Sequence, residues 1–106
     1  MTTRRATEQS VTVFCLMRPK PDRAEGLRDS LMALVRPTRA EAGCLAYDLY
    51  EEADGSLVLF ETWRSPAELA AHQQQPAVQK LFGEQLSELL AEDIGVHQGA
   101  LLLPAA

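Results

Sequence analysis

The sequence predicts an α+β domain in which one antiparallel four-stranded sheet carries helices on one face. Strand-like and helix-like segments follow one another in the order β-α-β-β-α-β, and an Asp-Gly pair separates the two middle strands. The 106 residues are enough for one hydrophobic core without staples. We expect a single domain over residues 11–103, preceded by a flexible tail over residues 1–10.

The first predicted strand, Val11 to Met17, is apolar at six of its seven positions, which is typical of a strand covered on both faces. Prolines after this strand prevent further ladder pairing. Asp22 and Glu25 then have the spacing of a capping box, which predicts that a helix starts there.

That helix has an apolar stripe with a spacing of three and four residues, which must pack against another element. The stripe consists of Ala24, Leu27, Leu31 and Leu34. Pro37 lacks an amide proton, so we expect a kink or a restart near Arg36. Gly43 is the expected end of the helix.

Two further strands, Cys44 to Glu51 and Ser56 to Arg64, flank the hairpin signal Ala53-Asp54-Gly55. Immediately after them, Ser65, Pro66 and Glu68 supply an N-cap, a first-turn proline and a capping-box partner. A second helical region therefore begins at this point.

Pro76 interrupts the second helical region and can open another helix. The apolar stripe of that helix is Val78, Leu81, Phe82, Leu86, Leu89 and Leu90. The apolar stretch from Ile94 to Leu103 is predicted as the fourth strand, ending at Pro104.

This element order is the ferredoxin-like split βαβ arrangement, with right-handed crossovers that place both helical regions on one face of the sheet. The strands nevertheless have apolar residues on both faces. In the third strand, Leu57, Leu59 and Trp63 project to one side, whereas Val58 and Phe60 project to the other. We therefore expect a second copy of the chain to cover the bare face in a homodimer.

Charge and cysteine content exclude several partners and compartments. The net charge of −5 would repel a phosphate backbone, so we expect no nucleic acid partner. No apolar run reaches the length of a membrane helix, and residues 1–10 lack a secretory signal. Cys15 and Cys44 are expected to be reduced thiols in the cytoplasm, with a disulfide as the alternative.

The sequence contains no GxGxxG, P-loop, GxSxG or HExxH motif. With only His72 and His97 available, carboxylates would have to supply most ligands of any metal site. We therefore expect no metal.

The candidate catalytic residues are Glu61, Trp63 and His72. Glu61 and Trp63 are two apart on one strand and so share a face, and His72 lies about two turns into the helix that follows. Leu69, three residues earlier, would lie on the same sheet-facing stripe. A histidine there can exchange a proton near neutral pH, with Trp63 as an aromatic wall and Glu61 as an orienting group.

The alternative assigns these three residues no chemistry. Trp63 would then be a core residue, His72 a partly exposed helix residue, and Glu61 the mark of a sheet edge.

Aromatic and apolar residues could complete a binding cavity. Tyr47 and Tyr50 lie on opposite faces of one strand, so at most one of them shares a given cavity. Phe14 and Phe82 are core aromatics by default, but they could hold an aromatic ligand together with Trp63 and Leu86. An open cavity of about 300 Å³ or more would admit such a ligand.

The span from Thr38 to Phe82 resembles the antibiotic biosynthesis monooxygenase domain, a group that includes small quinol monooxygenases. The matching pieces are Glu41-Ala42-Gly43-Cys44 before a strand with Tyr47, Glu61-Thr62-Trp63, and Leu69 to His72. This resemblance implies a dimeric α/β barrel and oxygenation of activated phenols or hydroquinones with dioxygen, without metal or flavin. It also implies that Trp63 and His72 lie in or beside the cavity, with Tyr47 and Glu61 as neighbours.

Haem-degrading relatives use an asparagine on the first strand, and Val11 to Met17 contains none, which argues against haem degradation. The sequence thus predicts a cofactor-independent monooxygenase of a small aromatic phenol or hydroquinone. Two alternatives stay open: a dimeric module that binds a small molecule without catalysis, and an isomerase that uses His72 as its base.

Overall fold

The computed structural model describes residues 10–102, and its elements follow the predicted order. Apart from Ser10, the predicted tail lies outside these residues, as does the predicted domain end at Leu103. The strands are β1 (Val11–Met17), β2 (Cys44–Glu51), β3 (Leu57–Trp63) and β4 (Gly95–Gly99). The helical segments are α1 (Ala24–Arg39), α2 (Pro66–Gln73), α3 (Pro76–Val78), η2 (Gln79–Gln85) and α4 (Leu86–Leu89).

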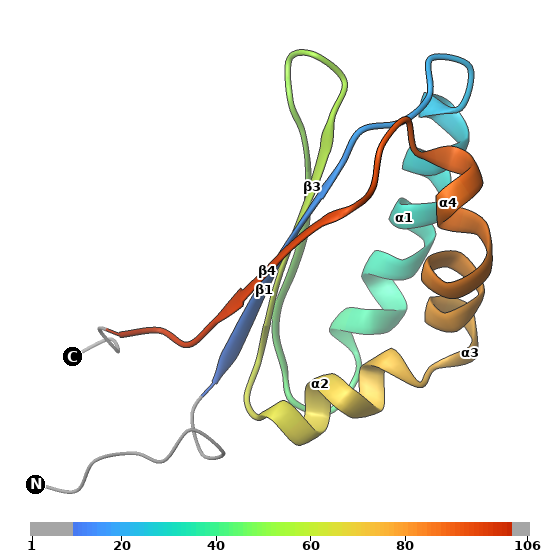
Figure 1. Cartoon of the computed structure of the whole chain (residues 1–106). Helices are drawn as coiled ribbons and strands as arrows, with labels where there is room; N and C mark the ends of the chain where they lie inside the picture. Colours follow the sequence, from blue (N-terminus) through green and yellow to red (C-terminus); the bar gives the residue numbers. More distant parts are fainter. Residues whose placement is uncertain (1–9, 103–106) are drawn as a thin grey trace, which may run out of the picture.

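The strands form one antiparallel sheet in the order β2-β3-β1-β4. α1 connects β1 to β2, and the segments from α2 to α4 connect β3 to β4. Both connections pass over the same face of the sheet (Figure 1). The predicted ferredoxin-like fold class is confirmed.

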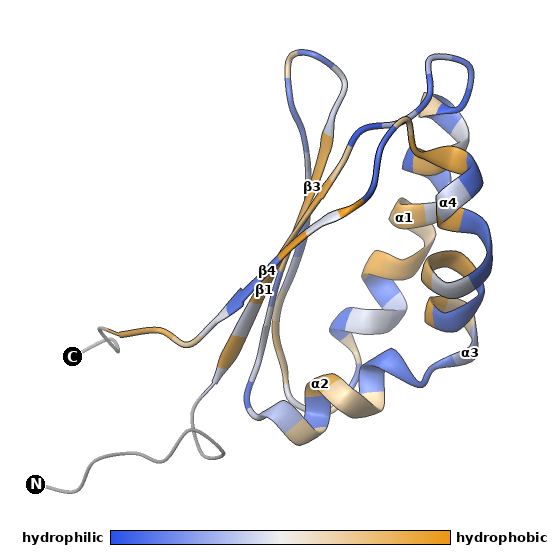
Figure 2. Cartoon of the chain, in the orientation of Figure 1, coloured by the Kyte–Doolittle hydropathy of each residue, from blue (hydrophilic) through white to orange (hydrophobic). Residues whose placement is uncertain are grey.

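The core lies between the sheet and the helices, on what we call the inner sheet face. β1 and β3 bury every second residue there, as period-two alternation requires. These residues are Val11, Val13, Cys15, Met17, Leu57, Leu59, Glu61 and Trp63. Leu27, Leu31 and Leu34 of α1 pack against them, which confirms the predicted stripe for these leucines. Figure 2 shows the resulting apolar bands along α1, α4 and the central strands.

The opposite side, the outer sheet face, includes Phe14, Leu16, Tyr50, Val58 and Phe60, and the strand registers also place Asp48 opposite Phe60 and His97 opposite Phe14. Phe14, Leu16 and Tyr50 are 41%, 44% and 56% exposed, and no described element covers them. The Phe14 and Phe60 rings meet edge to face with centroids 5.0 Å apart. The expectation that Phe14 is a core aromatic is wrong, because strand alternation turns its ring away from the helices.

Helix α1 differs from its prediction at both ends. Arg23, not Asp22, is its N-cap and makes no side-chain capping bond, because residues 21–23 form a preceding turn closed by Arg23 N–H to Lys20 O. Pro37 neither interrupts nor restarts the helix, which continues to Arg39. The proline lies in the last turn, where removing one amide donor breaks only one bond near the helix end.

The sequence predicted that the helix ends at Gly43, but α1 ends at Arg39 and residues 40–43 form a turn. Gly43 adopts φ +82°, a conformation that favours glycine. A Cβ atom at Gly43 would also collide with the Glu68 carboxylate, which pairs with Arg64. This turn therefore brings the start of β2 close to the start of α2.

The predicted hairpin and the predicted α2 cap are both present. Gly55 has φ +88°, and the Asp54 side chain accepts a hydrogen bond from Ser56 N at 2.8 Å. β3 begins at Leu57, one residue later than expected. At α2, Ser65 Oγ accepts from Glu68 N at 3.3 Å and donates to Glu68 Oε1 at 2.9 Å.

The segment after Pro76 is not a uniform α-helix, because seven of its residues form the π-helical turn η2 between the short helices α3 and α4. Gly83 lies inside η2. The predicted stripe still faces the core, with Val78, Leu81, Leu86 and Leu90 buried. Phe82 and Leu89 are partly buried against the same core.

β4 is shorter than predicted, since it has five residues, from Gly95 to Gly99, and within residues 10–102 it pairs with β1 alone. Beyond it, Leu101 and Leu102 are 59% and 90% exposed and form no strand. Among residues 10–102, no helix is long and apolar enough to cross a membrane.

Candidate active site

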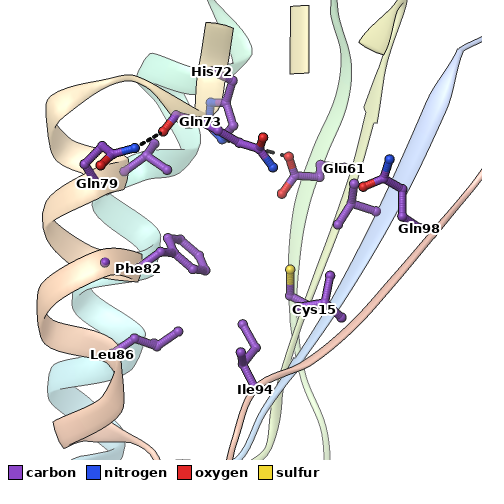
Figure 3. A pocket seen from close by; sticks show the side chains of 13 residues that line it. Cys15, Glu61, His72, Gln73, Gln79, Phe82, Leu86, Ile94 and Gln98 are labelled. Atoms are coloured by element: carbon purple, nitrogen blue, oxygen red, sulfur yellow. Dashed lines mark hydrogen bonds and ion pairs between the residues drawn. The ribbon is translucent and has the colours of Figure 1, made fainter. Parts of the chain in front are cut away.

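A cavity of about 410 Å³ lies between the inner sheet face and the segment from α2 to α4. Its walls are mostly apolar and come from β1, from the second helical segment and from the chain around β4. Figure 3 shows Phe82 and Leu86 on the helical side, facing Cys15 and Ile94 on the sheet side. The volume exceeds the roughly 300 Å³ at which ligand binding becomes plausible.

One end of the cavity is polar, and it carries Glu61 of β3 and His72 of α2 (Figure 3). Trp63, two residues after Glu61, donates its indole N–H to Glu61 Oε1 at 2.8 Å. The His72 ring stacks on Trp63 with centroids 4.7 Å apart and an interplanar angle of 30°. His72 Nε2 lies 3.9 Å from Glu61 Oε1. The strand spacing and the capped helix thus bring the three predicted catalytic residues together.

Glu41 completes this polar cluster from the turn between α1 and β2. Its Oε2 lies 3.1 Å from His72 Nδ1, and its Oε1 lies 3.3 Å from the same atom. A hydrogen bond to the acceptor oxygens of a carboxylate requires the tautomer in which Nδ1 carries the proton. In neutral His72 the Nε2 atom is therefore the basic nitrogen, next to Glu61.

Burial dominates the electrostatics of the cluster. It raises the pKa of Glu61, and the charge of Glu41 acts in the same direction, whereas the Trp63 hydrogen bond and nearby His72 oppose the rise. Burial also raises the pKa of Cys15 to about 12, with Glu61 contributing. The Cys15 thiol is consequently protonated at neutral pH and provides no thiolate nucleophile.

Four of the predicted site residues line the cavity: His72, Glu61, Phe82 and Leu86. Trp63 does not line it, because the indole is fully buried behind His72 and Glu61. Leu69 is also buried in the core rather than on the cavity wall.

Tyr47 and Phe14, two further predicted ligand-binding residues, do not line the cavity. Tyr47 lies behind His72, with ring centroids 5.6 Å apart, and burial raises the pKa of its hydroxyl. Phe14 is on the outer sheet face, so its predicted place in the cavity is wrong.

The alternative prediction, in which Glu61, Trp63 and His72 have no chemical role, is contradicted in two of its details. His72 is only 3% exposed rather than partly exposed, and Glu61 lies on β3, which has a strand on either side. Its third statement agrees with the structure, since Trp63 is a core residue.

Sequence reasoning missed several residues of the site. Glu41 belongs to the Glu41-Ala42-Gly43-Cys44 motif, but nothing in its spacing indicates a contact with His72, 31 positions away. Cys15 could have been placed by alternation with Val13 on β1. The other missed polar lining residues are Gln73, Gln79 and Gln98. Among residues 10–102, no cluster of three or more His, Cys, Asp or Glu side chains has the geometry of a metal site.

Known proteins resemble this chain along most of its length. The Mycobacterium tuberculosis protein "Putative monooxygenase Rv0793" is 45% identical over 87 residues, which cover 81% of this chain and 85% of that protein. The solved structure of Rv0793 has a TM-score of 0.85 at 43% identity, covering 92% of this chain and 99% of that one. The PA3566 structure from Pseudomonas aeruginosa has a TM-score of 0.81 at 32% identity, covering 92% and 98% of the two chains.

A third relative, the Synechocystis protein sll1783, is 32% identical over 90 residues. The match covers 83% of this chain and 60% of that protein. The family model for antibiotic biosynthesis monooxygenases matches residues 10–84, which include β1, the Glu41 turn, Glu61, Trp63 and His72. The chain therefore belongs to the antibiotic biosynthesis monooxygenase family.

Proposed function

We propose that the protein is a cofactor-independent monooxygenase that oxidises a small aromatic phenol or hydroquinone with dioxygen. The observation that carries this proposal is the Glu41–His72–Glu61 cluster, of which His72 and Glu61 line a mostly apolar cavity of about 410 Å³. The apolar walls suit an aromatic ring. The polar end suits a hydroxyl group that gives up a proton.

The first step is proton transfer from the ring hydroxyl to His72 Nε2. Glu41 holds the other ring nitrogen, so the proton taken up at Nε2 produces an imidazolium next to two carboxyl groups. Trp63 fixes Glu61 by its indole N–H and supports the imidazole by stacking. Positioning residues of this kind keep the base aligned with the substrate hydroxyl.

The substrate itself supplies the electrons for oxygen reduction. The deprotonated ring passes one electron to dioxygen, and the two radicals combine to form a carbon–oxygen bond. Cleavage of the O–O bond leaves one oxygen atom on the ring and releases the other as water. The substrate loses two hydrogens and gains one oxygen, so no external reductant is needed. The apolar walls shield the intermediates from water.

Oxygen consumption by the purified, chelator-treated protein tests this proposal. Naphthohydroquinones and anthrones form the substrate panel, and autoxidation without protein is subtracted. We expect uptake by the wild type and a loss of roughly 10²–10⁴-fold in kcat for His72→Ala. Gln74→Ala is the control, because Gln74 follows α2, is exposed and does not line the cavity.

No protein-dependent uptake across the panel would overturn the oxygenase proposal. Conversion of a compound under anaerobic conditions would instead identify an isomerase with His72 as base. Saturable binding without any conversion would identify a binding module.

We also propose that the working form is a cytoplasmic homodimer, with residues 11–103 as one domain in each subunit. The exposed apolar residues of the outer sheet face support a second copy as its cover. Covering this face in both subunits is expected to bury more than about 1,600 Å² in total, the size of a stable interface. Two free cysteines agree with a reducing compartment.

A further inference from the structure

We propose that Gly83 sets the number of fused rings that the cavity admits. This inference rests on the proposed function for its choice of aromatic ligands, but binding alone can test it. Gly83 is a lining residue of the cavity and lies within η2. A Cβ atom at this position would meet no atom within 4 Å, so the space beside it is open.

The backbone does not require glycine at position 83. Among residues 10–102, positive φ angles occur only at Gly43 and Gly55. Glycine in a helix interior lowers helix stability relative to alanine. Glycine is therefore unfavourable for the helix at position 83, although other residues could adopt the same backbone conformation. What the glycine provides is the space that a side chain would fill.

Gly83 directly follows Phe82 on the helical wall of the cavity. Val78, Phe82 and Leu86 form the apolar part of this wall, and Gln79 and Gly83 line the cavity beside them. Gln79 is held in place because its side-chain amide donates to Gln73 O at 2.7 Å. Figure 3 shows this helical wall opposite Cys15, Ile94 and Gln98, with Glu61 and His72 at one end.

A ligand with its hydroxyl at Glu61 and His72 must extend along the helical wall as rings are added. One ring stays near the polar end, whereas a third fused ring reaches the stretch lined by Phe82, Gly83 and Leu86. A large side chain at position 83 would then exclude three-ring compounds before it affects single rings.

Anaerobic titration calorimetry with phenol, 1-naphthol and 1-anthrol tests this prediction, since no oxidation occurs during the measurement. We expect Gly83→Leu to raise the Kd of 1-anthrol at least tenfold, to raise that of 1-naphthol less, and to leave that of phenol within twofold. Gly83→Ala should produce the same order with smaller changes.

Gly26 provides the matched control. It lies in α1, is exposed, has no atom within 4 Å of an added Cβ and does not line the cavity. Gly26→Ala and Gly26→Leu should therefore leave all three Kd values unchanged. Thermal unfolding checks that every variant is folded, and both alanine variants should unfold at a higher temperature than the wild type.

Equal changes in Kd for all three ligands in Gly83→Leu would overturn the inference, as would the same loss in Gly26→Leu or an absence of binding to the wild type. Size-dependent binding without oxygen uptake would overturn only the oxygenase proposal. Oxygen uptake without ring-size dependence would overturn only the role of Gly83.

Discussion

The two faces of the sheet are built from the same strands by the same alternation, yet only one is covered by the chain itself. On the inner sheet face, α1 and the segment from α2 to α4 bury β1 and β3 side chains and leave a cavity with a polar end. On the outer sheet face, Phe14, Leu16 and Tyr50 remain at least 41% exposed. Apolar side chains alone therefore do not distinguish a core from an interface.

What distinguishes the faces is where charge is placed. The inner sheet face carries a buried carboxylate, Glu61, whose cost is offset by Trp63 and His72. Among residues 10–102 the outer sheet face has no buried charged group: Asp48, opposite Phe60, is partly exposed and pairs with Arg39, and His97, opposite Phe14, is exposed. The first face is suited to a ligand and the second to a copy of itself.

The largest expected effect comes from a charge on the outer sheet face. Phe60→Asp would place a carboxylate in the proposed interface, at a cost of roughly several kcal/mol in association free energy. Sedimentation equilibrium should give twice 11.7 kDa, or a multiple of that dimer, for the wild type and a loss of the folded dimer for the variant.

Met32→Asp is the control for this substitution, because Met32 is 58% exposed but lies on α1. It should leave the dimer intact. A wild type that is a folded, soluble monomer would contradict the assignment of the outer sheet face.

A smaller effect is expected at the turn that holds Glu41 beside the inner sheet face. Gly43→Ala combines a positive φ angle with a collision against the Glu68 carboxylate. Forcing a residue other than glycine into such a conformation costs about 1–3 kcal/mol, and the collision adds to this cost. Urea unfolding, followed by fluorescence of the single tryptophan, Trp63, measures the change in unfolding free energy.

Gly55→Ala separates the cost of the positive φ angle from the cost of the collision, since Gly55 has φ +88° but no atom within 4 Å of an added Cβ. It should destabilise the protein less than Gly43→Ala. Equal losses would show that the close approach of the Glu41 turn to α2 contributes nothing.

The smallest effect concerns the pH dependence of stability. Burial raises the pKa of Glu61, so the folded state holds its proton more tightly than the unfolded state does. This contribution to stability is fully present below the ordinary glutamate value of 4.5 and is lost as the pH rises through the folded-state pKa. Glu61→Gln keeps an acceptor for Trp63 and should remove this loss.

The unfolding free energy of Glu61→Gln should therefore increase relative to the wild type as the pH rises towards neutrality. Glu51→Gln is the control, because Glu51 is exposed, and its unfolding free energy should follow the wild-type curve. A Glu61→Gln variant that loses stability relative to the wild type towards neutral pH would show that ionised Glu61 stabilises the fold.

The fold could be predicted largely from the sequence because its determinants are local. Ser65 and Pro66 cap α2, Asp54 and Gly55 close the hairpin, and alternation assigns Leu59 and Phe60 to opposite faces. The errors also have local causes. Pro37 is tolerated because it lies in the last turn of α1. The π-helical turn around Gly83 was missed because the spacing of its apolar residues does not differ clearly from that of an α-helix.

The site was less predictable because its contacts are not local. Glu61 and Trp63 share a strand, so their proximity follows from spacing. Glu41 and His72 meet only because a glycine turn brings the start of β2 against α2, which no pattern in either segment encodes. Phe14 was misplaced because an apolar strand does not indicate which of its faces the helices cover.

The central claim, that ligand and partner use opposite faces, can be tested directly by NMR of methyl-labelled protein titrated anaerobically with 1-naphthol. Leu86 and Ile94 line the cavity, whereas Leu16 and Val58 lie on the outer sheet face. The account predicts saturable shifts of the Leu86 and Ile94 methyl signals and unchanged Leu16 and Val58 signals. Shifts confined to Leu16 and Val58 would contradict it.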